Sequence, residues 1–103
     1  MRSTDVLMAF FTSSVLVAPF CAAKTHRLSI SGMAFTTPSL VIEKGDTVEW
    51  TNQDIVPHTV TGNNFDSGTL ESGATWKRTF SEVGNVDYKC SFHPSMTGRV
   101  QVK

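Results

Sequence analysis

Short stretches in which hydrophobic and polar residues alternate recur along residues 24–103. Val48 and Trp50 alternate with polar neighbours in one stretch, and Val100 and Val102 do so near the end of the chain. Such alternation is typical of a β-strand with one buried face, because successive side chains point to opposite faces. The stretches expected to form strands are 27–31, 39–42, 47–51, 58–61, 75–80, 86–90 and 97–103.

Turn-forming residues separate the expected strands. Gly45 lies in a polar turn at 43–46, where glycine can supply the positive φ that tight turns require. Residues 62–73 hold three glycines among mostly polar side chains and are expected to form a loop. The sequence shows no helical period sustained over three turns and no internal repeat. It therefore predicts an all-β domain, a β-sandwich of about seven short strands.

Residues 1–23 differ in pattern from the rest of the chain. Arg2 precedes an apolar stretch at 6–20, and small residues follow at 21–23. This order is typical of a secretory signal peptide, which we expect to be cleaved after Ala23. The alternative is a retained membrane anchor, but the apolar stretch is shorter than the ~20 residues that a spanning helix needs.

Cleavage after Ala23 leaves residues 24–103 as one exported domain, expected in the periplasm. Attachment to the membrane through an uncleaved N-terminal segment is the alternative. Acylation of Cys21 is a further alternative, but Pro19 and Phe20 fit poorly just before a lipid-carrying cysteine.

Composition narrows the class of protein. The 103 residues carry 9 Lys and Arg against 9 Asp and Glu, so the net charge is zero and a nucleic-acid partner is not expected. A hydrophobic content of 40% with 17% charged residues argues against a disordered chain. After signal cleavage Cys90 is the only thiol, so no disulfide can stabilise this small core, whereas a bound metal could.

Four side chains match a known set of metal ligands. Cys90, His93 and Met96 follow one another at intervals of three between two expected strands, and His58 follows Pro57 well upstream. Two imidazoles, a thiolate and a weak thioether are the ligands of blue-copper sites, because both Cu(I) and Cu(II) tolerate them. A zinc site is less consistent, since no second cysteine remains near the ligand loop.

These motifs make residues 35–103 resemble the cupredoxins, the blue copper family that includes plastocyanin and amicyanin. The pieces that carry the resemblance are 45–52, 57–60, 84–90, 93–94 and 96–100. The short spacings in the last loop are similar to those of amicyanin. The resemblance implies a Greek-key β-sandwich with one type 1 copper ion at one end. Family members often have Asn after the first ligand histidine; here Thr59 stands there, so we expect a looser tie between the ligand loops.

The expected function is to carry single electrons between redox partners by cycling between Cu(II) and Cu(I). Copper delivery with the same ligands is the alternative, although a buried site discourages the exchange that delivery needs. An enzyme is not expected, because no oxyanion-hole or orienting-carboxylate pattern accompanies Cys90 and His93.

We expect the edge of the His93 ring to reach the surface, where redox partners would dock transiently. The side chains expected to form an apolar collar around it are Met33, Phe35, Pro57, Phe92, Pro94 and Met96. His26 has no motif around it and is expected to be a surface residue. The protein is expected to be a monomer, without a membrane span in the mature chain.

Overall fold

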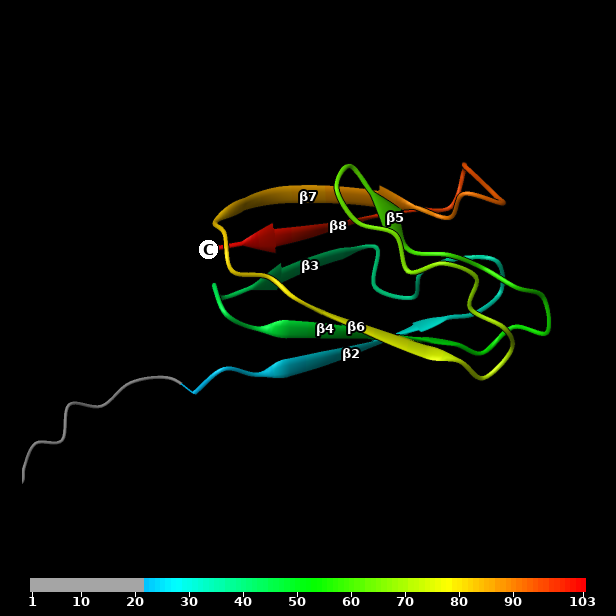
Figure 1. The fold of residues 1–103 in the computed structure, drawn as a ribbon, viewed down its shortest axis with the longest axis horizontal. Helices are drawn as coiled ribbons and strands as arrows, with labels where there is room; N and C mark the ends of the chain where they lie inside the picture. The colour runs from blue at the N-terminus through cyan, green and yellow to red at the C-terminus, as the bar shows by residue number, and fades with distance from the viewer. Residues whose placement is uncertain (1–21) are drawn as a thin grey trace, which may run out of the picture.

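Seven strands in two sheets make up the part of the chain that the structure, a computed structural model, describes, residues 22–103 (Figure 1). The strands are β2 (Thr25–Ile30), β3 (Ser39–Ile42), β4 (Thr47–Asn52), β5 (Thr61–Gly62), β6 (Thr75–Thr79), β7 (Gly84–Lys89) and β8 (Thr97–Val102). Except for its last two positions, the expected signal segment at 1–23 lies outside the described residues. No helix within residues 22–103 has the length and apolar character needed to cross a membrane.

The two sheets are joined in a Greek-key manner. One sheet has the strand order β2-β4-β6, and the other has the order β3-β8-β7-β5. The β2–β4 and β3–β8 pairs are parallel, whereas the remaining pairs are antiparallel. Every connection except β7–β8 passes from one sheet to the other, so each sheet covers the inner face of its partner. The predicted all-β sandwich is confirmed.

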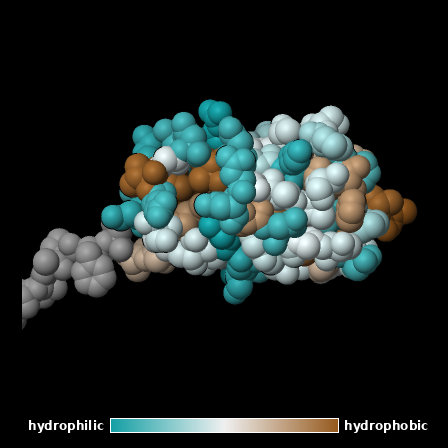
Figure 2. Space-filling model, turned by 45° about the horizontal axis from the view of Figure 1, so that its top comes forward, coloured by the Kyte–Doolittle hydropathy of each residue, from teal (hydrophilic) through white to brown (hydrophobic). Residues whose placement is uncertain are grey.

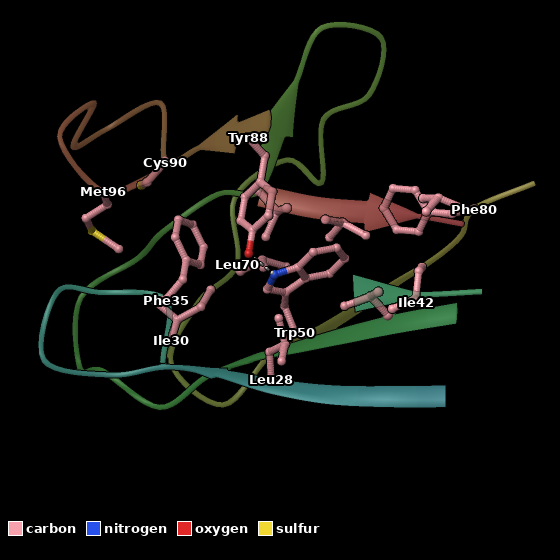
Figure 3. Packing of buried hydrophobic residues seen from close by; sticks show 14 residues of the cluster. Leu28, Ile30, Phe35, Ile42, Trp50, Leu70, Phe80, Tyr88, Cys90 and Met96 are labelled. Atoms are coloured by element: carbon pink, nitrogen blue, oxygen red, sulfur yellow. Dashed lines mark hydrogen bonds between the residues drawn. The ribbon is translucent and has the colours of Figure 1, made fainter. Parts of the chain in front are cut away.

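Side chains from the inner faces of both sheets form one core (Figure 3). The alternating hydrophobic positions predicted in β4 and β8 are all buried. At the centre, the fully buried Trp50 donates its indole N–H to the Tyr88 hydroxyl, with 3.3 Å between nitrogen and oxygen. Gly98 lies opposite Tyr88, and a Cβ there would overlap the tyrosine ring. This contact explains why a glycine occurs within β8.

The strand expected at 58–61 is wrong. Only the last residue of that stretch belongs to a strand, the two-residue β5, which pairs with β7. His58 forms an isolated bridge, in which its backbone N–H and carbonyl bond Leu70 at 3.1 and 2.8 Å. The backbone before β5 therefore finds its hydrogen-bond partners in the following loop, and no strand is needed to satisfy it.

The segments that carry the expected ligands meet at one end of the sandwich, away from the C-terminus (Figure 1). β7 leads directly into Cys90, and β8 begins directly after Met96. His58 follows the loop that leaves β4. Across the core, β4 contacts β7 through the hydrogen bond between Trp50 and Tyr88. The sheets thus deliver ligands from two distant stretches of sequence to the same end.

Candidate metal centre

Three of the four expected ligands converge in the structure. One ligand atom each from His58, Cys90 and His93 lies within 4.8 Å of the others. Cys90 Sγ is 3.7 Å from Nδ1 of His58 and 3.7 Å from Nδ1 of His93. Bond lengths usual in first-row metal sites, about 2.3 Å to sulfur and about 2.0 Å to nitrogen, let one ion reach all three atoms. The donor set is therefore that of a His₂Cys trigonal copper site.

Short hydrogen bonds shape the loop between β7 and β8. The Cys90 N–H donates to the Met96 carbonyl at 3.0 Å, which closes the loop at its base. Within it, the His93 N–H bonds the Cys90 carbonyl and the Met96 N–H bonds the His93 carbonyl, at 3.2 and 2.9 Å. Met96 is buried, and Figure 3 shows it at the same end of the core as Cys90. The loop thus holds the backbone of all three residues at one end of the core, and its Cys90 and His93 side chains belong to the cluster with His58.

The surroundings of Cys90 favour its thiolate form. Burial raises the pKa of the thiol. Hydrogen bonds from the Thr59 N–H, 3.3 Å from Sγ, and from the imidazoles of His93 and His58 lower the pKa by more than burial raises it. The net result is a pKa of about 6, well below the usual value. At neutral pH the sulfur is therefore mostly a thiolate, the form that binds metal ions.

Comparisons with known proteins agree with this chemistry. Residues 21–103 match the copper binding proteins of the plastocyanin/azurin family. The chain belongs to this family. It is 35% identical to amicyanin from Paracoccus denitrificans, over 84% of this chain and 74% of the relative. It is 34% identical to amicyanin-alpha from Methylorubrum extorquens, over 98% of this chain and 88% of the relative.

Solved structures show the same likeness. A Cu(I) form of an amicyanin variant superposes with a TM-score of 0.74 at 30% identity, over 77% of this chain and 82% of that one. A purple cupredoxin from Nitrosopumilus maritimus gives 0.71 at 31% identity, over 76% and 99% of the two chains. Together with the His₂Cys cluster, membership of this family makes the chain a blue copper electron-transfer protein with one type 1 copper, and not an enzyme.

Asp54 supports the cupredoxin site and was missed in the sequence. Its Oδ2 lies 2.8 Å from Nε2 of the fully buried His58. The backbone N–H groups of Met33 and Gly32 also donate to this carboxylate, and with His58 they lower the pKa of Asp54. A carboxylate on Nε2 keeps the proton there and leaves Nδ1 free to bind a metal. The only sequence signal was an acidic residue four positions before a ligand histidine.

Thr59 ties the two ligand loops together. Its hydroxyl oxygen accepts the Ser91 N–H at 2.8 Å and lies 3.0 Å from the Ser91 hydroxyl. The same oxygen is 2.8 Å from the hydroxyl of Thr61, while the Thr59 N–H points at Cys90 Sγ. The looser tie expected from the missing Asn is therefore not what the structure shows, because neighbouring hydroxyls supply the bonds.

The exposed apolar surface at this end differs from the expected collar. Phe35, 3% exposed, and Met96 are buried in the core, so neither belongs to the surface. Ile55, which is 93% exposed, and Val56 were missed, because alternation does not say which way a loop side chain points. The collar, as the structure has it, consists of Met33, Ile55, Val56, Pro57, Phe92 and Pro94. Figure 2 shows strongly hydrophobic atoms projecting from this end.

His93 and His26 have different surroundings. His93 is half-buried beside the collar, as expected for a ligand with one edge near the surface. His26 is also partly buried and lies outside the metal cluster, where its Nε2 is 2.9 Å from Asp46 Oδ2. The surface histidine expected from the sequence is thus half of a carboxylate–imidazole pair.

Proposed function

We propose that His58, Cys90, His93 and Met96 are the ligands of the type 1 copper and that electrons pass through the edge of His93. The convergence of two Nδ1 atoms on one thiolate carries this proposal. When bound, copper supplies the one-electron Cu(II)/Cu(I) couple. The chain's own part is to hold the His58 ring through Asp54 and to tie the two ligand loops together through Thr59 and Ser91, so that little rearrangement accompanies the change of charge.

Voltammetry of the copper-loaded protein tests this role. We expect one reversible couple that transfers one electron per protein. His93→Gly opens the ligand set at its half-buried member and should abolish or strongly shift that couple, while Ser95→Ala in the same loop serves as the matched control. An unchanged couple in His93→Gly would contradict the proposed electron path.

We further propose that redox partners dock transiently on the apolar collar around His93. Exposed aliphatic side chains beside a half-buried ligand suit brief contacts, because the contact is small and no charged group has to be desolvated. Electron self-exchange between Cu(I) and Cu(II) copies, measured by NMR line broadening, tests this without a known partner. Ile55→Lys should slow the exchange about tenfold, because like charges then meet at the contact.

Val83→Lys is the control for that variant. Val83 is 67% exposed and lies in the turn before β7, at the other end of the sandwich. Its charge change equals that of Ile55→Lys, so it should leave self-exchange nearly unchanged. Equal rates in both variants would show that the collar is not the contact.

The proposed location is the periplasm, after export and cleavage of residues 1–23, with 24–103 as the working domain. The signal-like pattern of the N-terminus supports this, and so does β2, the first strand within the described residues, which begins at Thr25 just beyond the expected cleavage point. A monomer fits the small collar. Fractionation of cells that express the full chain, with the mass of the recovered protein, tests both location and cleavage.

A further inference from the structure

Asp46 forms a second cluster of polar contacts, at the end of the sandwich opposite the metal ligands (Figure 1). The residue is only 3% exposed. Its carboxylate lies 2.9 Å from His26 Nε2, accepts the Glu43 N–H at 3.1 Å and accepts the Lys24 N–H at 3.0 Å. The cluster therefore joins the beginning of β2 to the turn before β4.

Among the described residues, Lys24 is the first that hydrogen bonds hold through both its backbone nitrogen and its carbonyl. Its nitrogen bonds Asp46, and its carbonyl accepts the Thr47 N–H at 2.8 Å. Ala22 and Ala23, just before it, are exposed and lie outside every strand of the described chain. Within residues 22–103, hydrogen bonds to the rest of the domain thus begin at the residue that follows the expected signal cleavage.

We propose that cleavage after Ala23 turns the backbone nitrogen of Lys24 into an α-ammonium group that pairs with Asp46, so that maturation itself strengthens the fold. This inference rests on the proposed export. A host signal peptidase would hydrolyse the Ala23–Lys24 peptide bond with one water: the hydroxyl joins the Ala23 carbonyl, and hydrogen goes to the Lys24 nitrogen. The small residues Ala23 and Cys21, at the first and third positions before the cut, suit that class of enzyme.

The change from amide to ammonium has a direct physical consequence. Before cleavage the Lys24 amide N–H donates to the Asp46 carboxylate; after it, two opposite charges lie at the same 3.0 Å contact, and their attraction adds to the hydrogen bond. Asp46 is ionised at neutral pH, because His26 and the surrounding N–H groups hold its pKa at about 2. An α-amino group is largely protonated at pH 7, since its usual pKa is about 7.7–8.0. Before cleavage, His26 is the only ionisable side chain that bonds this carboxylate in the described chain. The precursor should therefore be less stable and easier to export unfolded.

Urea unfolding of the metal-free precursor and of the exported mature protein tests the proposal, together with the mature protein's mass. We expect the mature chain to begin at Lys24 and its folding equilibrium constant to exceed the precursor's by about tenfold, as expected when an ion pair replaces a bond from a neutral amide to the same carboxylate. Asp46→Asn, introduced into both forms, should reduce this ratio to within about twofold, because the amide carries no charge. Asp87→Asn, at an exposed carboxylate paired with Arg99, is the matched control and should leave the ratio unchanged.

Acetylation of the α-amino group of Lys24, in the otherwise unaltered mature chain, covers the case in which Asp46→Asn does not fold. It removes the charge and keeps one N–H donor, so the mature chain should fall to the stability of the precursor. A mature protein that begins elsewhere overturns the cleavage site. Equal stabilities of the two forms, or an unaltered stability after acetylation, overturn the ion pair but leave the proposed export standing.

Discussion

Asp54 shows how one carboxylate prepares a ligand. Its Oδ2 accepts hydrogen bonds from His58 Nε2 and from the Met33 N–H, and its Oδ1 accepts one from the Gly32 N–H. Both oxygens are therefore needed as acceptors. This arrangement fixes the His58 ring before any metal arrives. The conformational entropy of orienting the imidazole is thus lost on folding and not on metal binding.

Asp54→Asn should weaken copper binding by about 10–100-fold, the usual effect of losing such a partner. An amide has one acceptor oxygen, so a backbone N–H or the imidazole N–H loses its bond. Competition with a chelator of known affinity measures the change. Asp87→Asn, at a surface ion pair away from the ligand loops, is the control. Equal affinities in the two variants would show that Asp54 does not position His58.

The sequence singled out the three residues that converge in the structure, but not the residue that supports His58. His58, Cys90, His93 and Met96 stand out because few residue types bind copper and their spacing is regular. Asp54 is one acidic loop residue among several, and its role depends on how the backbone folds around it. Such three-dimensional contacts leave no periodic trace in the sequence.

Among the strands, β4 and β7 are joined across the core by one contact between their side chains. Trp50 and Tyr88 meet edge to face, with ring centroids 5.4 Å apart, and share a buried hydrogen bond. Burial raises the pKa of the Tyr88 hydroxyl, so it stays neutral and can accept the indole N–H. Because β7 leads into Cys90, this contact also fixes where the thiolate lies.

Tyr88→Phe should lower the free energy of unfolding by about 1–3 kcal/mol, because the buried indole N–H of Trp50 loses its acceptor. Urea unfolding followed by tryptophan fluorescence measures it. Thr79→Val removes a hydroxyl from an exposed pair with Thr47 and should cost much less. A loss no larger in Tyr88→Phe than in Thr79→Val would contradict the importance of the bond between the sheets.

Most of the elements followed from alternation, and the exception is instructive. β4 and β8 have clean alternation and were predicted closely, since each has one face in the core. The stretch 58–61 also alternates, but its backbone bonds the loop that follows it. Alternation reports which side chains are buried and not which backbone groups pair.

At the scale of the whole molecule, Asp46 links stability to pH. Its pKa in the folded protein is about 2, lowered by His26 and by the Lys24 and Glu43 N–H groups from an ordinary value near 3.8. The folded state therefore binds this proton less readily than the unfolded state does. The stabilisation is fully present above about pH 4 and is lost as the pH falls toward 2.

The urea midpoint of the metal-free protein should therefore fall between pH 4 and pH 2, and Asp46→Asn should flatten part of that fall. The variant loses the ionised acceptor, so it should already be less stable at pH 6. Unfolding curves at several pH values measure both effects. A wild-type profile that matches the variant's at every pH would contradict the role of Asp46.

A bound metal should also stabilise the whole domain. The described chain has one cysteine, Cys90, which is free, so no disulfide joins its strands. Copper that binds only the folded state adds about 2.7 kcal/mol when its free concentration is a hundred times Kd. The melting temperature should therefore be clearly higher with Cu(II) than without it. Equal melting temperatures, with bound copper confirmed, would show that the ligand loops are not coupled to the fold.

The visible spectrum reports whether His58, Cys90 and His93 bind one copper ion through the Cys90 thiolate. Titration of the metal-free protein with Cu(II) should produce an intense absorption band in the visible region that saturates at one copper per chain. Cys90→Ser should abolish the band, whereas Ser95→Ala should keep it. A wild-type protein without the band, or a Cys90→Ser protein that retains it, would contradict a copper–thiolate bond at Cys90.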